Sequence, residues 1–129
     1  MILYVAAQDR EGAAMVAAWL ADAGHTITSR WVWTTGDMRT KTLPVEERRK
    51  IAIMDEEDVR RATDGLVLLA DPRGLCPGGK HVETGMAIAL GRNVYVVGSE
   101  ENIFHCHPLV RVFSSVSELI KELNAVEAH

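Results

Sequence analysis

Residues 66–85 read LVLLADPRGLCPGGKHVETG, and this stretch decides the fold. Its first five residues are all apolar, as in a strand that is buried on both faces of a parallel sheet. Asp71-Pro72-Arg73-Gly74 then breaks the regular structure. The spacing predicts a helix from about residue 80 to residue 90, closed by Gly91. A buried strand that leads through a turn into a helix is the repeating unit of an α/β protein.

The same alternation extends over the rest of the chain. Strands are also expected at residues 2–6, 25–29, 94–97 and 110–113, and helices at 10–23, 44–63 and 115–126, with Ser115 or Ser117 capping the last one. The alternating Thr and Ile of residues 25–29 favour an edge position. We therefore expect one α/β domain over residues 1–129: a doubly wound, roughly five-stranded parallel sheet of flavodoxin or Rossmann type with helices on both faces. In such a sheet ligands bind at the carboxyl ends of the strands.

Composition narrows the partners. The chain has 129 residues and a formal net charge of -4, which gives no general attraction to nucleic acid or to anionic lipid. No apolar stretch approaches the ~20 residues that span a bilayer, so no membrane partner is expected. The chain starts in a strand-like run without a charged leader, and Cys76 and Cys106 are too few for a disulfide framework. We expect a cytoplasmic location.

Glu83 is the first candidate for chemistry. The expected helix start near Lys80 places it in a first turn, at the carboxyl edge of the sheet. Free N–H groups and the helix dipole favour an ionised carboxylate there, and the resulting low pKa suits a nucleophile. The alternative is a helix-capping carboxylate without chemistry, because acidic residues are common in first turns.

A second candidate lies in the acidic run of residues 55–58. Asp55 and Asp58 are i and i+3 and share one helix face. One interpretation is a solvated acidic surface balanced by Arg60 and Arg61. The other requires Asp55 to lie in a cleft beside Glu83, where two carboxyl groups push their pKa values apart and one stays protonated to assist a leaving group. Glycosidic cleavage uses this division of labour.

Four segments, in this order, resemble the nucleoside 2-deoxyribosyltransferase superfamily, including its 2'-deoxynucleoside 5'-monophosphate N-glycosidases. They are residues 3–6, 24–31, 55–62 with Asp64, and 78–91, and the last, GGKHVETG onward, is the most specific. The resemblance implies that Glu83 is the nucleophile that attacks the anomeric carbon and holds a covalent deoxyribosyl intermediate. It implies that Asp55 assists departure of the base and that Tyr4 positions the glutamate.

The same resemblance implies that Asn102 is contributed to the sugar site of a neighbouring subunit, and hence a homodimer or higher homo-oligomer. The implied substrate is a small nucleoside or nucleotide, and no cofactor is expected. The chain departs from the family in having Ala6-Ala7 where a glycine is usual, a longer loop between Asp71 and Glu83, and a different C-terminal tail. Asp71 is a candidate for the carboxylate that transferases place before the glutamate. These departures count against base exchange more than against N-glycosidic cleavage.

Further residues are candidates for substrate binding. Arg10 falls where the monophosphate hydrolases have an arginine close to the 5'-phosphate, and Gly78 and Gly79 begin a helix whose N–H groups could hold an anion. Trp31 and Trp33 alternate along an expected extended segment and share a side, either to stack on a base or to pack against the sheet or a partner.

His81 is expected beside the substrate, because it belongs to the same turn as Glu83. It also forms part of a group with His105, Cys106 and His107 and with Cys76, whose spacing fits no zinc signature, so no metal is expected. The sequence therefore predicts hydrolysis of an N-glycosidic bond. The alternatives are a base-exchanging transferase and a nucleotide-binding module without turnover.

Overall fold

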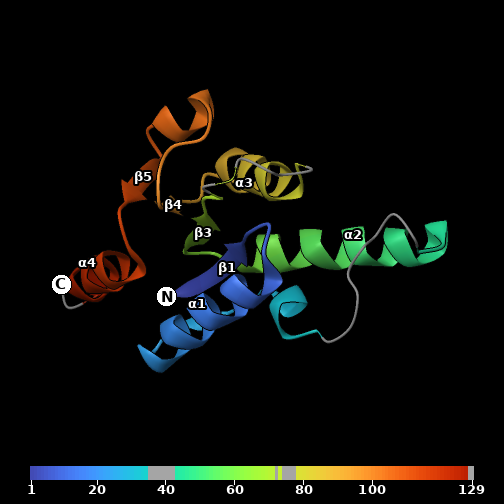
Figure 1. Cartoon of the computed structure of the whole chain (residues 1–129), viewed down its shortest axis with the longest axis horizontal. Coiled ribbons are helices and arrows are strands. Elements are labelled where there is room, and N and C mark those ends of the chain that lie inside the picture. The colour runs from blue at the N-terminus through green and yellow to red at the C-terminus, as the bar shows by residue number, and fades with distance from the viewer. Residues whose placement is uncertain (35–42, 72, 74–77, 128–129) are drawn as a thin grey trace.

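A computed structural model describes residues 1–34, 43–71, 73 and 78–127 (Figure 1). The elements are β1 (Ile2–Ala6), α1 (Arg10–Asp22), β2 (Thr26–Ile27), the 3-10 helix η1 (Arg30–Trp33), α2 (Val45–Arg61), β3 (Gly65–Leu69), α3 (Gly79–Ala89), β4 (Val94–Val97), the 3-10 helix η3 (Ile103–Cys106), β5 (Val110–Phe113) and α4 (Val116–Glu127).

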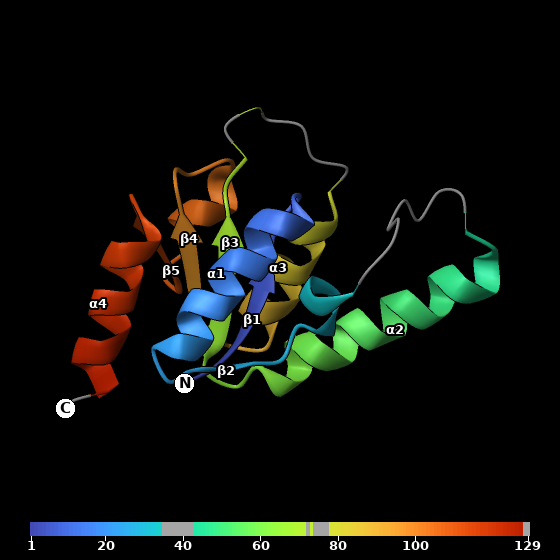
Figure 2. The same cartoon turned by 60° about the horizontal axis from the view of Figure 1, so that its bottom comes forward.

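The described strands form one five-stranded sheet in the order β2-β1-β3-β4-β5, and all four pairings are parallel. Helices α1 and α4 cover one face of the sheet, and α2 and α3 cover the other (Figure 2). The strand order reverses direction beside β1, so β1 and β3 border the point where a doubly wound sheet binds its ligands. The predicted fold class is confirmed.

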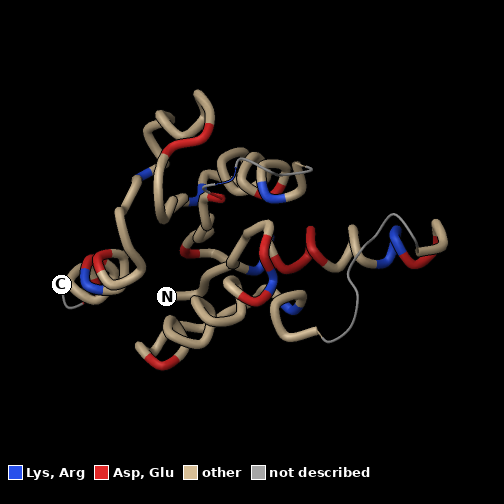
Figure 3. Tube along the Cα trace, in the orientation of Figure 1, with Lys and Arg blue, Asp and Glu red and all other residues tan. Residues whose placement is uncertain are grey.

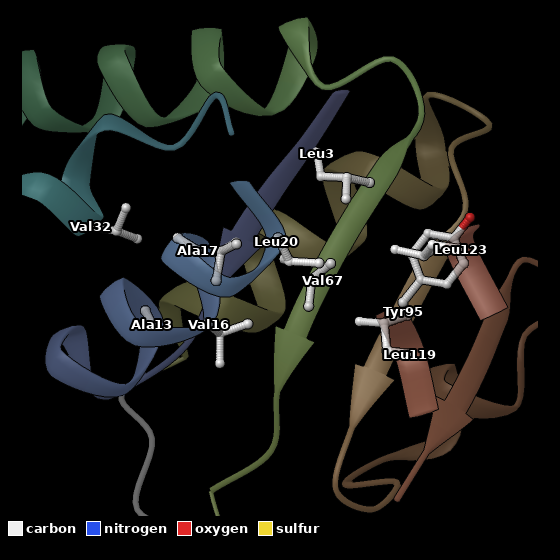
Figure 4. Packing of buried hydrophobic residues seen from close by; sticks show 11 residues of the cluster. Leu3, Ala13, Val16, Ala17, Leu20, Val32, Val67, Tyr95, Leu119 and Leu123 are labelled. Carbon is white, nitrogen blue, oxygen red and sulfur yellow. The ribbon is translucent and has the colours of Figure 1, made fainter. Parts of the chain in front are cut away.

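Alternate residues of β1 serve the two faces of the sheet, as the pleat of a strand requires. Leu3 and Val5 pack towards α1 and α4, whereas Tyr4 and Ala6 face α2 and α3. All four side chains are buried. The buried apolar side chains thus form two core clusters, one on each face of the sheet. Figure 4 shows the cluster under α1 and α4, with Leu3, Ala13, Val16, Ala17, Leu20, Val32, Val67, Tyr95, Leu119 and Leu123.

The second strand is at the edge of the sheet, as predicted, but it is shorter than expected and covers only Thr26–Ile27. The reason is that the Ser29 side chain replaces a backbone partner: its Oγ accepts a hydrogen bond of 3.0 Å from the N–H of Val5. The last helix begins at Val116, and Ser115 Oγ accepts from the N–H of Glu118, which makes Ser115 its cap.

Helix α2 begins one residue later than predicted, because Pro44 is its N-cap and not its first helical residue. Its N-terminal half extends past the edge of the sheet (Figures 1 and 2) and is largely exposed. Figure 3 shows charged residues along its length. Residues 35–42, between η1 and α2, lie outside the described residues. No helix in the described ranges is long and apolar enough to cross a membrane.

Candidate active site

An open cleft of about 430 Å³ lies between α2 and α3, at the carboxyl end of β1. It contains the carboxyl groups of Asp55, from α2, and Glu83, from α3. Its remaining walls are largely apolar and come from Ala7, Trp31, Ile51, Ala52, Val82 and Met86. The structure thus brings together the two acidic residues that the sequence singled out, from segments 28 residues apart.

Tyr4 contacts one member of this pair, Glu83. It is fully buried on β1, and its hydroxyl donates a hydrogen bond to Glu83 Oε2. Helix α3 begins at Gly79, so Glu83 lies in its second turn. The sequence had predicted the first turn. The carboxyl group of Glu83 therefore does not cap the helix N-terminus, and its described hydrogen-bond partner is Tyr4.

The electrostatics of Glu83 are the reverse of the prediction. Burial raises the pKa of Glu83, the hydrogen bond from Tyr4 lowers it, and the negative charge of Asp55 adds a smaller rise; together these effects bring the pKa of Glu83 to about 8. The expected low pKa is wrong, because the helix dipole acts on the first turn and an apolar cleft acts on the second. Burial, and then the negative charges of Glu83 and Asp55, raise the pKa of Tyr4, which stays a hydrogen-bond donor.

Asp55 faces the cleft without a fixed partner. Its Oδ1 is buried and has no hydrogen-bond partner among the described residues. Burial and then the charge of Asp58 raise the pKa of Asp55 to about 6, and Arg30 works in the opposite direction. The two carboxyl groups therefore differ in pKa, as predicted, but Glu83 holds its proton more tightly than Asp55.

Asp58, one turn further along α2, is part of a buried ion pair. Its side chain is fully buried and contacts the guanidinium groups of Arg30 and Arg61, each at 2.9 Å. The interpretation of the acidic run as a solvated surface is therefore wrong for Asp58. It holds for Glu56, which pairs with Arg60 at 2.8 Å on the exposed side of the helix.

Trp31 borders the cleft, but not in the way the sequence suggested. Residues 30–33 form a 3-10 helix rather than an extended segment, so Trp31 and Trp33 do not share a side. The Trp31 indole N–H donates to the carbonyl of Val5 at 2.9 Å, and its ring packs against both core clusters. Trp33 is 52% exposed. Trp31 is thus both a wall of the cleft and a packing residue.

Asp71 lies in a neighbouring cavity of about 330 Å³. Its carboxylate accepts hydrogen bonds from the backbone N–H of Arg73, at 2.9 Å, and from the Arg73 guanidinium. These hydrogen bonds lower the pKa of Asp71. Arg10 is the first residue of α1, and the described lining of either cavity does not include it. Among the described residues, neither Asp71 nor Arg10 lines the cleft that holds Glu83.

His81 and Asn102 lie on the other side of α3, in a cavity of about 540 Å³. Asn102 Oδ1 accepts from the N–H of Phe104, which turns its amide nitrogen towards His81 Nδ1 at 3.4 Å. The His81 ring lies 5.9 Å from that of His105. His81 and Glu83 are two positions apart on α3 and face different sides of the helix, so they line different cavities. That His81 lies beside the substrate stays a prediction.

Gly78 and Gly79 stand at the start of α3, the helix that carries Glu83. Gly78 is its N-cap with a φ of 104°, a conformation that suits glycine, and Gly79 lines the cleft. Lys80, the next residue, is buried and pairs with Glu101 at 2.6 Å, which ties the start of α3 to the loop after β4. Among the described residues, no group of three or more His, Cys, Asp and Glu is placed to hold a metal ion; Cys76 lies outside them.

Several lining residues were not predicted. Ile51 stands four residues before Asp55 on α2, and Met86 stands three residues after Glu83 on α3. These spacings place each on the face of its acidic neighbour, which is a signal that the sequence already held. Gln8, which follows β1 and lines both the cleft and the Asp71 cavity, had no such signal.

No family model matches the chain, and no curated protein matches its sequence. Among solved structures it is similar to the CMP N-glycosidase BcmB of Clostridium botulinum, with a TM-score of 0.57 and 15% sequence identity. The match covers 95% of this chain and 98% of that chain. At this level of identity the likeness shows a shared fold, and it confirms at the level of fold the resemblance carried by the four segments.

Proposed function

We propose that this protein is an enzyme that hydrolyses the N-glycosidic bond of a 2'-deoxynucleoside or its 5'-monophosphate and releases the free base. The observation that carries the proposal is the cleft itself: two carboxyl groups of different pKa, one of them bound by a buried tyrosine, between apolar walls. Such a pair can divide the roles of nucleophile and proton donor. The protein of similar fold is itself an N-glycosidase of a nucleotide.

In the proposed first step the Glu83 carboxylate attacks C1' of the sugar. The bond from C1' to the base breaks, its electron pair passes to the base nitrogen, and Asp55, or a water that it holds, supplies the proton. In the second step water attacks C1', the bond to Glu83 breaks, and Asp55 takes up the water proton. Tyr4 keeps the attacking oxygen oriented and stabilises its charge.

The pKa values have a consequence for this mechanism. At neutral pH the free cleft favours a proton on Glu83 over Asp55, whereas the first step needs the reverse. Two pKa values about two units apart put roughly one molecule in a hundred in the reactive form. Because both forms carry one proton, the rate should follow a bell-shaped pH profile with limbs near 6 and 8.

The walls of the cleft suit a nucleobase. Trp31, Ile51 and Met86 present an indole and aliphatic side chains on which a flat heterocycle can pack. This surface holds the base by shape and leaves its polar edge to groups at the mouth, such as Gln8, which is exposed. The walls therefore support a nucleoside or nucleotide as substrate, and the family resemblance implies that its sugar is 2'-deoxyribose.

The experiment is a chromatographic screen of deoxynucleosides, ribonucleosides and their 5'-monophosphates for released base. We expect release from at least one deoxy compound. Adding a second free base separates the alternatives, because a base-exchanging transferase alone forms the new nucleoside. Thermal stabilisation by these compounds without any base release would contradict the proposal and favour a non-catalytic nucleotide-binding module.

We also propose that the chain forms a homodimer through the surface of α3 and η3. Val82 and Phe104 line the cavity that holds His81 and are exposed by 59% and 62%. Ile103, which directly precedes Phe104, is 81% exposed. Neighbouring apolar side chains that are this exposed are typical of interaction surfaces. Light scattering after gel filtration should show a dimer that Ile103→Glu dissociates and that Met15→Glu, at an exposed position on α1, leaves intact.

A further inference from the structure

Asp58 ties two segments of the chain together. Its carboxylate accepts hydrogen bonds from the backbone N–H of Arg30 at 3.0 Å and from Arg30 Nε at 2.9 Å. Its backbone carbonyl accepts from Thr28 Oγ1 at 2.7 Å, and its Oδ1 also accepts a hydrogen bond from the Arg61 guanidinium at 2.9 Å. A fully buried carboxylate with this many donors holds residues 28–30 against α2.

The contacts of Asp58 connect two walls of the cleft, one on α2 and one at Trp31. Asp55 is one turn before Asp58 on the same helix, and Trp31 directly follows Arg30. Both line the cleft, although neither Asp58 nor Arg30 is among its lining residues. The distance between the α2 wall and the Trp31 wall is therefore fixed by an ion pair behind them.

The same ion pair presents two opposite charges to Asp55. Asp58 raises the pKa of Asp55, and Arg30 lowers it. The other groups that face Asp55 come from different elements: Glu83 on α3 and Tyr4 on β1 interact with it electrostatically. Of these groups, Asp58 and Arg30 are the two that can be changed without removing a side chain from the cleft.

We propose that the Asp58–Arg30 ion pair is a positioning device that holds Asp55 at the cleft wall and sets its tendency to carry a proton. The inference rests on the proposed function only in so far as Asp55 supplies that proton to the departing base. Neither member of the ion pair lines the cleft. Each acts through Asp55, one by its negative charge and the other by its positive charge.

The test is the titration of the Asp55 carboxyl group, followed by carbon NMR in the whole chain, beside the pH profile of base release. Asp58→Asn keeps the size of the side chain and removes a negative charge, so the pKa of Asp55 should fall by about one unit. Arg30→Gln removes the positive charge and should raise it by a similar amount. The acidic limb of the pH profile should move with each.

Opposite shifts are the decisive result, because mere loosening of the segment would move both variants in the same direction. Shifts of the same sign, or no shift in either variant, would overturn the inference. Arg30→Lys keeps the charge and should leave the pKa of Asp55 near its wild-type value. Glu56→Gln, which removes an exposed charge on the same helix, is the matched control.

The two proposals fail in different ways. If no variant and no wild-type protein releases base, the proposed function fails, but the NMR titration still decides the role of the ion pair. If Asp58→Asn does not fold, Arg30→Gln carries the test, because the Arg30 side chain is half exposed and its removal leaves Asp58 paired with Arg61. An unmoved Asp55 titration in that variant overturns the inference.

Discussion

Two neighbouring cavities share Ala7 and Gln8 at the carboxyl end of β1, and each contains acidic groups. In one, Glu83 and Asp55 have no cationic partner within salt-bridge distance among the described residues, and burial raises the pKa of both. In the other, Asp71 binds Arg73, and the pKa of Asp71 falls. The comparison teaches that the pairing of a carboxyl group, more than its place at the sheet edge, decides whether it can exchange a proton near neutral pH.

The largest expected difference between the cavities is in activity. Glu83→Ala should reduce base release to less than about one-thousandth, because it removes the nucleophile. Asp71→Ala, the matched change in the other cavity, should retain activity within about threefold. Base release is measured by chromatography and folding by circular dichroism. Comparable losses in the two variants would remove the distinction between the cavities.

Asp55→Asn should reduce base release by about a hundredfold, the usual contribution of a proton donor. The loss should depend on pH. Without Asp55 the rate depends on ionised Glu83 alone, so it should rise with pH and no longer fall above pH 8. A pH profile from 5 to 9.5 checks this expectation. A bell-shaped profile that survives the substitution would assign the proton to another group.

Tyr4→Phe should cost about tenfold in the rate, because it removes one hydrogen bond to a charged oxygen. The Tyr4 hydrogen bond lowers the pKa of Glu83, so its loss should move the alkaline limb of the pH profile upward. Tyr95→Phe is the control, since it removes a buried hydroxyl from the other core cluster. Equal effects of the two variants would show a general packing defect.

Stability should respond in opposite directions in the two cavities. The folded-state pKa of Glu83 is raised, so its contribution to stability is full below the unfolded pKa of about 4.3 and is lost as the pH rises to about 8. Glu83→Gln removes that cost, which is a few kcal/mol at most, and should raise Tm by about 5 °C at pH 8.5 and by less at pH 5. An unchanged difference between the two pH values in scanning calorimetry would refute the raised pKa.

The smallest effect is expected at Asp71. Its pKa is lowered, so its contribution is present above the unfolded pKa of about 3.9 and is lost as the pH falls through the lower folded value. Asp71→Asn should therefore lower Tm by about 1 °C at pH 7 and by less near pH 3. Calorimetry at the two pH values measures this, and a stabilisation at pH 7 would contradict it.

The fold was predictable because its signals are local. Residues 66–69 and 94–97 are apolar without interruption, and such runs between helical periods define a parallel sheet whatever the rest of the chain does. Ser115 and Gly91 mark helix ends through their own backbone and side-chain chemistry. The ends of β2 were not predictable, because Ser29 interrupts the ladder through a contact with Val5, 24 residues away.

The site was predictable as a set of residues and less so as a set of charges. The family resemblance implied that Tyr4, Asp55 and Glu83 share one site, and the structure brings the three side chains together. The direction of the pKa shift of Glu83 could not be predicted, because it depends on a one-residue difference in where α3 begins and on burial by distant segments. The role of Asp58 depends on Arg30, which the sequence does not mark as its partner.

The hydrogen bond from the Trp31 indole to Val5 gives the cleft a built-in optical reporter. The chain has three tryptophans, and Trp19 and Trp33 are 47% and 52% exposed, so a water-soluble quencher such as iodide reaches both. Trp31 is partly buried at the wall of the cleft, and a heterocycle stacked beside it would quench its emission. In a Trp19→Phe, Trp33→Phe background, fluorescence would therefore report occupancy of the cleft directly, without turnover.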